Sequence, residues 1–279
     1  MNVKRSPWRI VIMLCATATA GYIARVNVST AAPLLMKEFG LSQVAMGRIF
    51  SAFLLGYALF QVHSGALADR WGARRILTLA AWFWVLFTLL QCVVGLGPLH
   101  ASAAASVILF MAVRFFLGIT ASPAYPGAAQ GVSGWVLPHL QGRANGIVIA
   151  SIGLGSALAP PLVSNVMVHW GWRPALIVSA LPALIIALIW LRIREPEKVN
   201  LNRTEPGSTE EDQVPLRQGS LRSSSFILLT VSYTLQGYVG YIFVSWFYLY
   251  LVQERHFGLL SGAWMSSLPW ILSILSIHL

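Results

Sequence analysis

Charged residues are scarce in this chain of 279 residues, where Asp, Glu, Lys and Arg together make up only 10%. Soluble globular domains carry about 25% charged residues, and the mean hydropathy here is +0.69. The two cysteines, Cys15 and Cys92, both fall inside apolar stretches, which predicts small buried side chains and argues against a disulfide framework or a metal pair. The composition therefore excludes an ordinary soluble domain.

Catalytic and metal-binding motifs are also lacking. The sequence contains no H-E-x-x-H, G-K-[ST], G-x-S-x-G or C-x-x-C pattern, so we predict no enzyme activity, cofactor or metal site. The net charge of +10 raises the question of nucleic acid. The basic residues, however, form short clusters between apolar blocks, as in membrane proteins whose loop charges set the orientation. No nucleic-acid partner is predicted.

Long apolar blocks are what the sequence has instead. Roughly 20 apolar residues cross a bilayer as one helix, because every backbone polar group is then satisfied within the segment. Strand-type alternation is missing, which disfavours a barrel. We therefore predict an all-α membrane protein with about seven or eight transmembrane helices. The blocks span residues 10–36, 46–67, 76–97, 103–125, 144–168, 174–191, 226–252 and 260–279.

The polar residues between blocks predict the orientation and the domain organisation. One alternating topology places 13 of the Lys and Arg residues on one side and only four on the other, Lys37, Arg48, Arg173 and Arg255, so the N-terminus is expected in the cytoplasm. The long polar stretch 193–225 reads as a cytoplasmic linker. We predict a six-helix bundle in residues 1–192, the linker in 193–225, and the start of a second, incomplete bundle in 226–279.

Two arginines lie deep inside predicted spans. Arg25 is 16 residues past Arg9, roughly 24 Å along a helix, and Arg114 is 11 residues into the fourth span, roughly 16 Å deep. A charge at such depth costs at least about 2.5 kcal/mol. None of the nine Asp and Glu residues lies within a membrane span, so no counter-charge is at hand. Two arginines held by backbone carbonyls are the structural alternative, but the pattern favours a site for an anion.

Other polar side chains follow the same spacing. Tyr22, Arg25 and Ser29 share one face of the first helix, and Tyr57 and Gln61 share a face of the second. An aromatic ring in such a place suits a sugar or an apolar carbon skeleton, although each tyrosine alone is more often packing than ligand. We name Arg25, Arg114, Tyr22, Tyr57 and Gln61 as candidate substrate-binding residues.

A short basic turn joins the second and third blocks. It reads Gly65-Ala-Leu-Ala-Asp69-Arg70-Trp-Gly72-Ala-Arg74-Arg75. Gly65 permits close approach of a neighbouring helix, Gly72 permits positive φ in the turn, and Asp69 can cap a helix or pair with an arginine. Apart from any special role, the turn obeys the positive-inside rule.

This turn resembles the G-x-L-x-D-R-x-G-R-R signature of the major facilitator superfamily, in the same loop. The resemblance implies that the first six helices are that family's N-terminal bundle. It also implies a gating role, not substrate contact, for the motif residues Gly65, Asp69, Arg70, Gly72, Arg74 and Arg75. Residues 22–25, 46–53, 114–118, 122–126 and 246–255 further resemble one branch, the anion:cation symporters of sugar acids, other organic anions and phosphate. That likeness implies that Tyr22, Arg25, Tyr57 and Arg114 line the central site.

Two positions depart from the family pattern. The family commonly has Asp just before the first arginine and Glu seven residues after the second, where this chain has Ala24 and Ala121. Those acids are the expected proton-coupling groups. Their absence leaves open whether transport is coupled to H⁺ or to Na⁺.

The expected function is secondary transport of a small organic anion by alternating access, in a multi-pass protein of a bacterial inner membrane. The alternatives are a transport-inactive fragment of such a carrier, a drug–proton antiporter, and an integral-membrane enzyme or sensor.

Overall fold

The computed structural model describes residues 7–96, 102–193 and 223–276, and nearly all of these residues are helical. No strand occurs in the described ranges. The helices are α1 (Pro7–Phe39), α2 (Gln43–Trp71), α3 (Ala73–Val93), α4 (Ala103–Ala121), α5 (Ala124–Trp135), α6 (Pro138–Trp170), α7 (Trp172–Arg192), α8 (Ser224–Gln253) and α9 (Leu259–Ser276). Seven spans are long and apolar enough to cross a membrane, with α4 and α5 counted as one. The predicted all-α membrane fold is confirmed.

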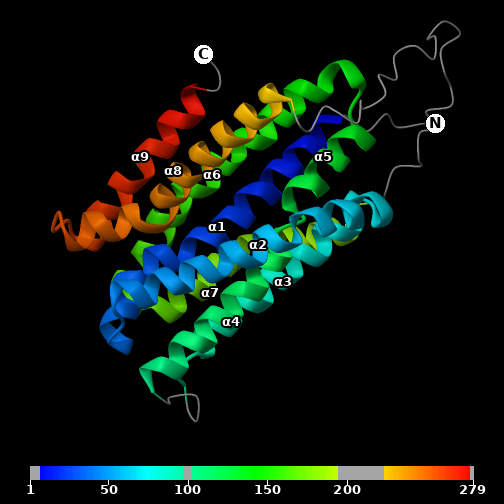
Figure 1. Ribbon diagram of the computed structural model, residues 1–279. Helices are drawn as coiled ribbons and strands as arrows, with labels where there is room; N and C mark the ends of the chain where they lie inside the picture. Colours follow the sequence, from blue (N-terminus) through cyan, green and yellow to red (C-terminus); the bar gives the residue numbers. More distant parts are fainter. Residues whose placement is uncertain (1–6, 97–101, 194–222, 277–279) are drawn as a thin grey trace, which may run out of the picture.

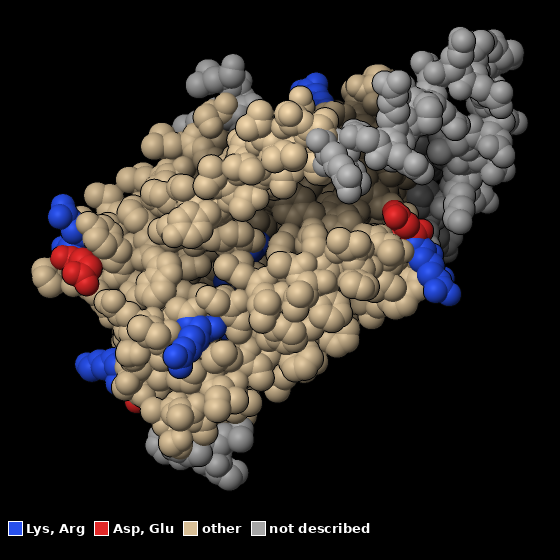
Figure 2. Space-filling model, viewed as in Figure 1, with Lys and Arg blue, Asp and Glu red and all other residues tan. Residues whose placement is uncertain are grey.

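The long helices run side by side between the two ends of the molecule (Figure 1). α1 packs on α6, α2 on α4, and α3 on α7, while α8 contacts α1 and α9 contacts α6. Large buried side chains such as Trp84 and Trp190 fill the space within the first six spans. The outward faces are apolar, as a lipid-facing surface requires, and the visible Lys, Arg, Asp and Glu gather mainly at the ends (Figure 2).

Small residues bring α1 and α6 into backbone contact. A Cβ atom added at Gly155 would lie 2.5 Å from the carbonyl oxygen of Thr19 and 2.7 Å from the Cβ of Tyr22. A residue without a side chain permits this close approach of the two helices. The contact matters for function because it fixes the segment of α1 that carries Tyr22.

The fourth span differs from its prediction. The apolar block was expected to end at residue 125, but the span continues to Trp135 as two helices, with a break between α4 and α5 at Ser122 and Pro123. Pro123 has no N–H to donate to the preceding turn. The Ser122 hydroxyl donates to the carbonyl of Ile119 at 2.7 Å and also bonds the Ser64 hydroxyl on α2. The break turns α5 so that Tyr125 lines the internal cavity described below.

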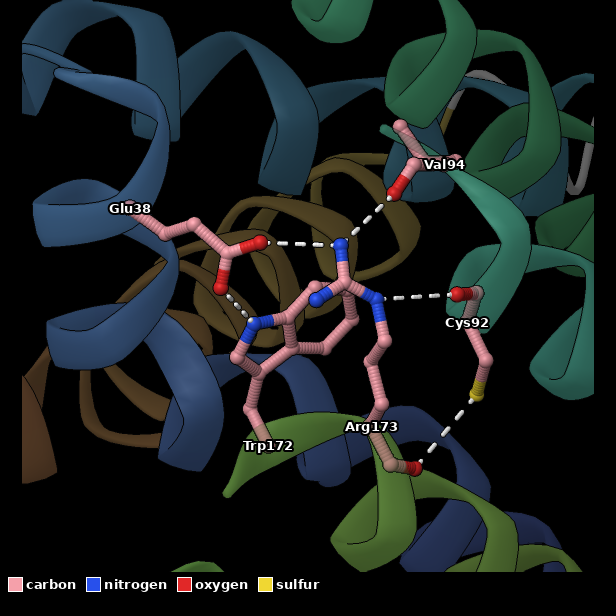
Figure 3. Close-up of polar contacts among 5 residues, drawn as sticks. All are labelled: Glu38, Cys92, Val94, Trp172 and Arg173. Atoms are coloured by element: carbon pink, nitrogen blue, oxygen red, sulfur yellow. Dashed lines mark hydrogen bonds and ion pairs between the residues drawn. The ribbon is translucent and has the colours of Figure 1, made fainter. Parts of the chain in front are cut away.

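A polar cluster joins three helix ends (Figure 3), at the end of the bundle opposite the start of α1. Arg173 forms an ion pair with Glu38 at 2.8 Å, and its Nε and terminal nitrogen donate to the carbonyls of Cys92 and Val94. Trp172 donates its indole N–H to the same Glu38 carboxylate at 2.6 Å. The ends of α1 and α3 and the start of α7 are thereby pinned to one another. Cys92 is a free thiol, as expected from the sequence.

The linker expected at 193–225 lies, except for residues 193 and 223–225, outside the described residues. On either side of it, α7 ends at Arg192 and α8 begins at Ser224. Residues 277–279 of the last apolar block are also outside the described ranges.

Candidate functional site

A cavity of about 540 Å³ lies between the first six spans and the pair α8 and α9. We call it the central cavity and define it by Tyr22, Arg25, Tyr57, Gln61 and Tyr241. A side cavity of about 260 Å³ shares Tyr22, Arg25 and Tyr57 with it and extends toward α5 and α6. In Figure 2 the middle of the molecule is hollowed and blue atoms of Lys or Arg are visible at depth. Four of the five predicted binding residues therefore line one space.

Arg25 is the charged group of the central cavity. Its side chain is largely buried, with 7% of the residue exposed. One terminal nitrogen donates to the Tyr22 hydroxyl at 3.3 Å, and the other donates to the Tyr241 hydroxyl of α8. Four aromatic rings surround the guanidinium carbon at 4.7 to 5.1 Å, those of Tyr22, Phe53, Tyr57 and Tyr241. These neutral rings stabilise the cation without neutralising it.

Arg114 lies behind the central cavity and does not line it. It contacts an inner pocket of about 10 Å³, room for one water molecule, which Arg25 and Tyr241 line as well. One terminal nitrogen donates to the backbone carbonyl of Arg25 at 3.2 Å, and the guanidinium carbon stands 4.7 Å from the Phe53 ring. Its Nε and its other terminal nitrogen are buried and have no hydrogen-bond partner among the residues that the structure describes. Buried donors without an acceptor cost free energy, so an acceptor that entered this pocket would be stabilised there.

No carboxylate compensates either arginine in the described part of the chain. The ion pair between Arg173 and Glu38 is the only one within 4.0 Å there, and it lies at the far end of the bundle. Arg25 and Arg114 thus place two positive charges around the Phe53 ring in a low-dielectric interior. An anion entering the cavity gains charge-assisted hydrogen bonds that the protein itself does not supply.

The remaining predicted residues differ in their contacts. Tyr57 stacks on Phe53 with ring centroids 6.2 Å apart and faces the cavity beside Arg25. The side-chain oxygen of Gln61 is buried in the cavity wall and has no hydrogen-bond partner in the described part of the chain. Both side chains can take hydrogen bonds from the hydroxyl groups of a polar solute.

The basic turn between α2 and α3 is only partly as expected. Gly72 adopts φ +84°, which supports the prediction of a positive φ in the turn. Arg74 donates to the carbonyls of Trp190 and Leu191, at 3.4 and 3.0 Å, and so caps the end of α7 instead of pairing with Asp69. Asp69, like Arg70 and Arg75, is exposed and forms no ion pair within the described ranges.

The close approach predicted at Gly65 is wrong. A Cβ atom there would be 4.0 Å from the Cβ of Pro126, which is an ordinary contact. The backbones of α2 and α4 instead meet at Gly56 and Gly118, where added Cβ atoms would lie 2.2 and 2.1 Å from carbonyl oxygens of the other helix. None of these contacts tests the predicted gating role of the turn.

Several cavity residues were missed from the sequence. On α8 these are Tyr233, Gln236 and Tyr241, which recur at helical spacing and could have been found as a polar stripe. Tyr125 of α5 was hidden because the break at Pro123 was not foreseen. The omission that matters most is Tyr241, since it is bonded to Arg25.

Comparisons with known proteins bear on the fold and the family. The family model for the Major Facilitator Superfamily matches residues 13–278. The chain is 30% identical to the "probable galactarate/D-glucarate transporter" of Bacillus subtilis, covering 94% of this chain and 61% of that protein. It is 25% identical to the "hexuronate transporter" of the same organism, covering 96% of this chain and 62% of that one. The chain thus spans about three fifths of the length of these relatives.

Solved structures agree at the level of the fold. A bacterial homologue of the human lysosomal transporter Spinster, in an inward-facing and unoccupied conformation, has a TM-score of 0.75 and 21% identity. That likeness covers 96% of this chain and 60% of the other. A D-xylose–proton symporter has a TM-score of 0.71 and 16% identity, covering 95% and 66% of the two chains.

Proposed function

Because this chain belongs to the major facilitator superfamily, we propose that it is a transporter, not an enzyme, and that its cavity takes the carboxylate of a sugar acid. The observation that carries the proposal is Arg25, a buried guanidinium that faces the central cavity and has no carboxylate partner in the described structure. The names of the relatives support the substrate class, since they refer to galactarate, D-glucarate and hexuronate.

In this proposal different cavity residues bind different parts of the solute. Arg25 binds the carboxylate, and Tyr22, Tyr57 and Gln61 take the hydroxyl groups and the carbon skeleton. Arg114 adds positive potential from the inner pocket behind Arg25. A lipophilic cation would meet repulsion here, which disfavours the drug–proton antiporter.

Transport itself requires alternating access, in which two helix bundles rock about a site at the midplane. The proposed bundles are residues 1–192 and a second one that starts at 226, joined through 193–225. At the end of the molecule remote from the N-terminus, the Trp246 ring of α8 packs on Phe50 of α2 with centroids 5.3 Å apart. This contact supports a cavity that is closed at that end and faces the cytoplasm.

The proposed orientation puts the N-terminus in the cytoplasm of a bacterial cell. Among the described residues, six arginines lie toward that end of the helices: Arg9, Arg70, Arg74, Arg75, Arg143 and Arg192. Four basic residues lie toward the other end: Lys37, Arg48, Arg173 and Arg255. An excess of Lys and Arg on the cytoplasmic side supports this choice. The basic turn at Asp69 then lies at the cytoplasmic end, where gating by the motif is proposed.

The first prediction tests the substrate class. D-glucarate should bind the purified chain in lipid nanodiscs at least about 100-fold more tightly than D-glucitol, because only the acid makes charge-assisted bonds to Arg25. D-glucitol is the matched control, since it has the same six-carbon chain and the same secondary hydroxyls, with a CH2OH group in place of each carboxylate. Isothermal titration calorimetry measures both. Equal binding of the two, or tighter binding of tetraphenylphosphonium, would remove the sugar-acid proposal.

The second prediction concerns protons. D-glucarate binding should change little between about pH 6 and about pH 8, because no His lines the cavities of the described structure and the carboxylates of the solute stay ionised. No Asp or Glu lines the cavities of the described structure. A strong pH dependence of binding to the unaltered chain would contradict this.

The matched pair of variants is at Ala121, which lines the side cavity where the family commonly has Glu. In Ala121→Glu the new carboxylate competes with D-glucarate for Arg25 when it is ionised and stops competing when it is protonated. Binding to this variant should therefore weaken as the pH rises. Ala121→Gln has the same shape and should stay flat across the range.

A further inference from the structure

Tyr241 stands between two spaces that each contain an arginine. It lines the central cavity together with Arg25, and it also lines the inner pocket, where Arg114 has two unpartnered donors. The wall between the large space and the small one thus consists in part of a single tyrosine side chain and the guanidinium that it bonds. A solute in the central cavity reaches Arg114 only if this wall gives way.

The groups that bond Arg25 are neutral. Both terminal nitrogens of its guanidinium donate to phenol oxygens, one from Tyr22 and one from Tyr241. Tyr22 is one turn away on the same helix, whereas Tyr241 comes from α8, 216 residues further along the chain. A carboxylate binds a guanidinium through two parallel bonds about twice as strong as neutral ones. A carboxylate therefore outcompetes the tyrosine, and an uncharged sugar does not.

We propose that Tyr241 is a placeholder ligand: in the empty protein its hydroxyl occupies the edge of Arg25 that the substrate carboxylate takes, and its displacement opens the inner pocket to Arg114. The inference rests on the proposed sugar-acid function and adds a specificity step to it. Only a solute that carries an acid group releases Tyr241, and only then do the orphaned donors of Arg114 gain an acceptor.

The displacement also bears on α8. Besides the Tyr241 bond, a polar contact between α8 and α1 in this region comes from the Ser29 hydroxyl, whose single hydrogen is shared between the carbonyls of Val26 at 2.7 Å and Val244 at 3.0 Å. Five residues past Tyr241, the Trp246 ring also packs on the Phe50 ring of α2. Loss of the Tyr241 bond therefore removes one of the polar contacts between this segment of α8 and the first bundle. Substrate binding is in this way coupled to movement of α8.

The third prediction follows from the competition. Tyr241→Phe keeps the ring over Arg25 but removes the competing hydroxyl, so D-glucarate should bind about tenfold more tightly while D-glucitol binding does not change. Tyr241→Glu puts a permanent carboxylate on Arg25 and should weaken D-glucarate binding by at least about 100-fold. Tyr238→Phe is the matched control, because Tyr238 is 67% exposed on the same helix and should leave binding unaltered.

The outcomes separate the two proposals, with Arg25→Ala measured alongside and titration calorimetry as the readout. If Arg25→Ala abolishes binding and Tyr241→Phe leaves it as in the unaltered chain, the placeholder is wrong and the sugar-acid site stands. If Tyr241→Phe binds D-glucarate more weakly, Tyr241 is a direct substrate ligand and the placeholder is again wrong. If the unaltered chain does not bind D-glucarate, both proposals fall.

Discussion

Replacing Arg25 by alanine is expected to weaken D-glucarate binding by about 100-fold or more. A hydrogen bond to a charged group contributes about 1.5–3 kcal/mol, and a carboxylate makes two of them to a guanidinium. Arg25 is the only arginine that lines the central cavity in the described structure, and Arg114 lies behind it in the inner pocket. Calorimetric titration of D-glucarate into the variant in nanodiscs measures the loss.

Arg25→Lys separates charge from geometry. Lysine keeps the positive charge but lacks the planar fork, so it should recover part of the lost affinity and still bind about tenfold more weakly than the unaltered chain. Arg48→Ala is the charge-matched control. Arg48 is exposed on α2 and does not line the central cavity, so its loss should leave binding unaltered.

The thermal stability of Arg25→Ala distinguishes a binding role from a structural one. A buried cation without a counter-charge costs free energy, so its removal should leave the midpoint of thermal unfolding unchanged or raise it. An arginine retained to hold helices together would show the reverse. A variant that keeps D-glucarate affinity, or that loses affinity only because it unfolds, would contradict the assignment of Arg25.

The features predicted well from the sequence are those that depend on local pattern. The apolar blocks predicted the spans, because length and hydropathy are nearly sufficient to recognise a helix that crosses the bilayer. The spacing of Tyr22 and Arg25 placed both on one face of α1, and their side chains are bonded to each other. The depth of Arg25 in its span, with no acid near it in the sequence, predicted an unpaired guanidinium, as the structure has.

The features that were missed depend on contacts between distant segments. Arg114 was expected beside the substrate, but the packing of α2 on α4 places Phe53 next to it and leaves it in the inner pocket. Tyr241 meets Arg25 across the interface between the first six spans and α8, which no local spacing reveals. Asp69 and Arg74 are close in the sequence, yet the Arg74 guanidinium donates its hydrogen bonds to backbone carbonyls at the end of α7.

The glycine pair Gly56 and Gly118 links stability to the site. A Cβ atom at Gly118 would lie 2.1 Å from the carbonyl oxygen of Phe53 and 2.9 Å from the backbone nitrogen of Tyr57. These neighbours are backbone atoms, so no side-chain rotation can relieve the clash, and α2 and α4 have to separate. Phe53 and Tyr57 are also two of the rings that surround Arg25. A change at this crossing therefore acts on both the fold and the cavity.

We expect Gly118→Ala to reduce the free energy of unfolding by about 3 kcal/mol or more, since overpacking at a rigid contact costs about 1–3 kcal/mol and here the obstacle is backbone. Gly146→Ala is the control. It is also helical, nothing lies within 4 Å of its added Cβ, and alanine favours a helix over glycine by about 1 kcal/mol. Thermal unfolding in detergent, followed by size-exclusion chromatography, compares the two. If Gly118→Ala melts with Gly146→Ala and binds D-glucarate normally, the close crossing of α2 and α4 is not what positions Phe53 and Tyr57.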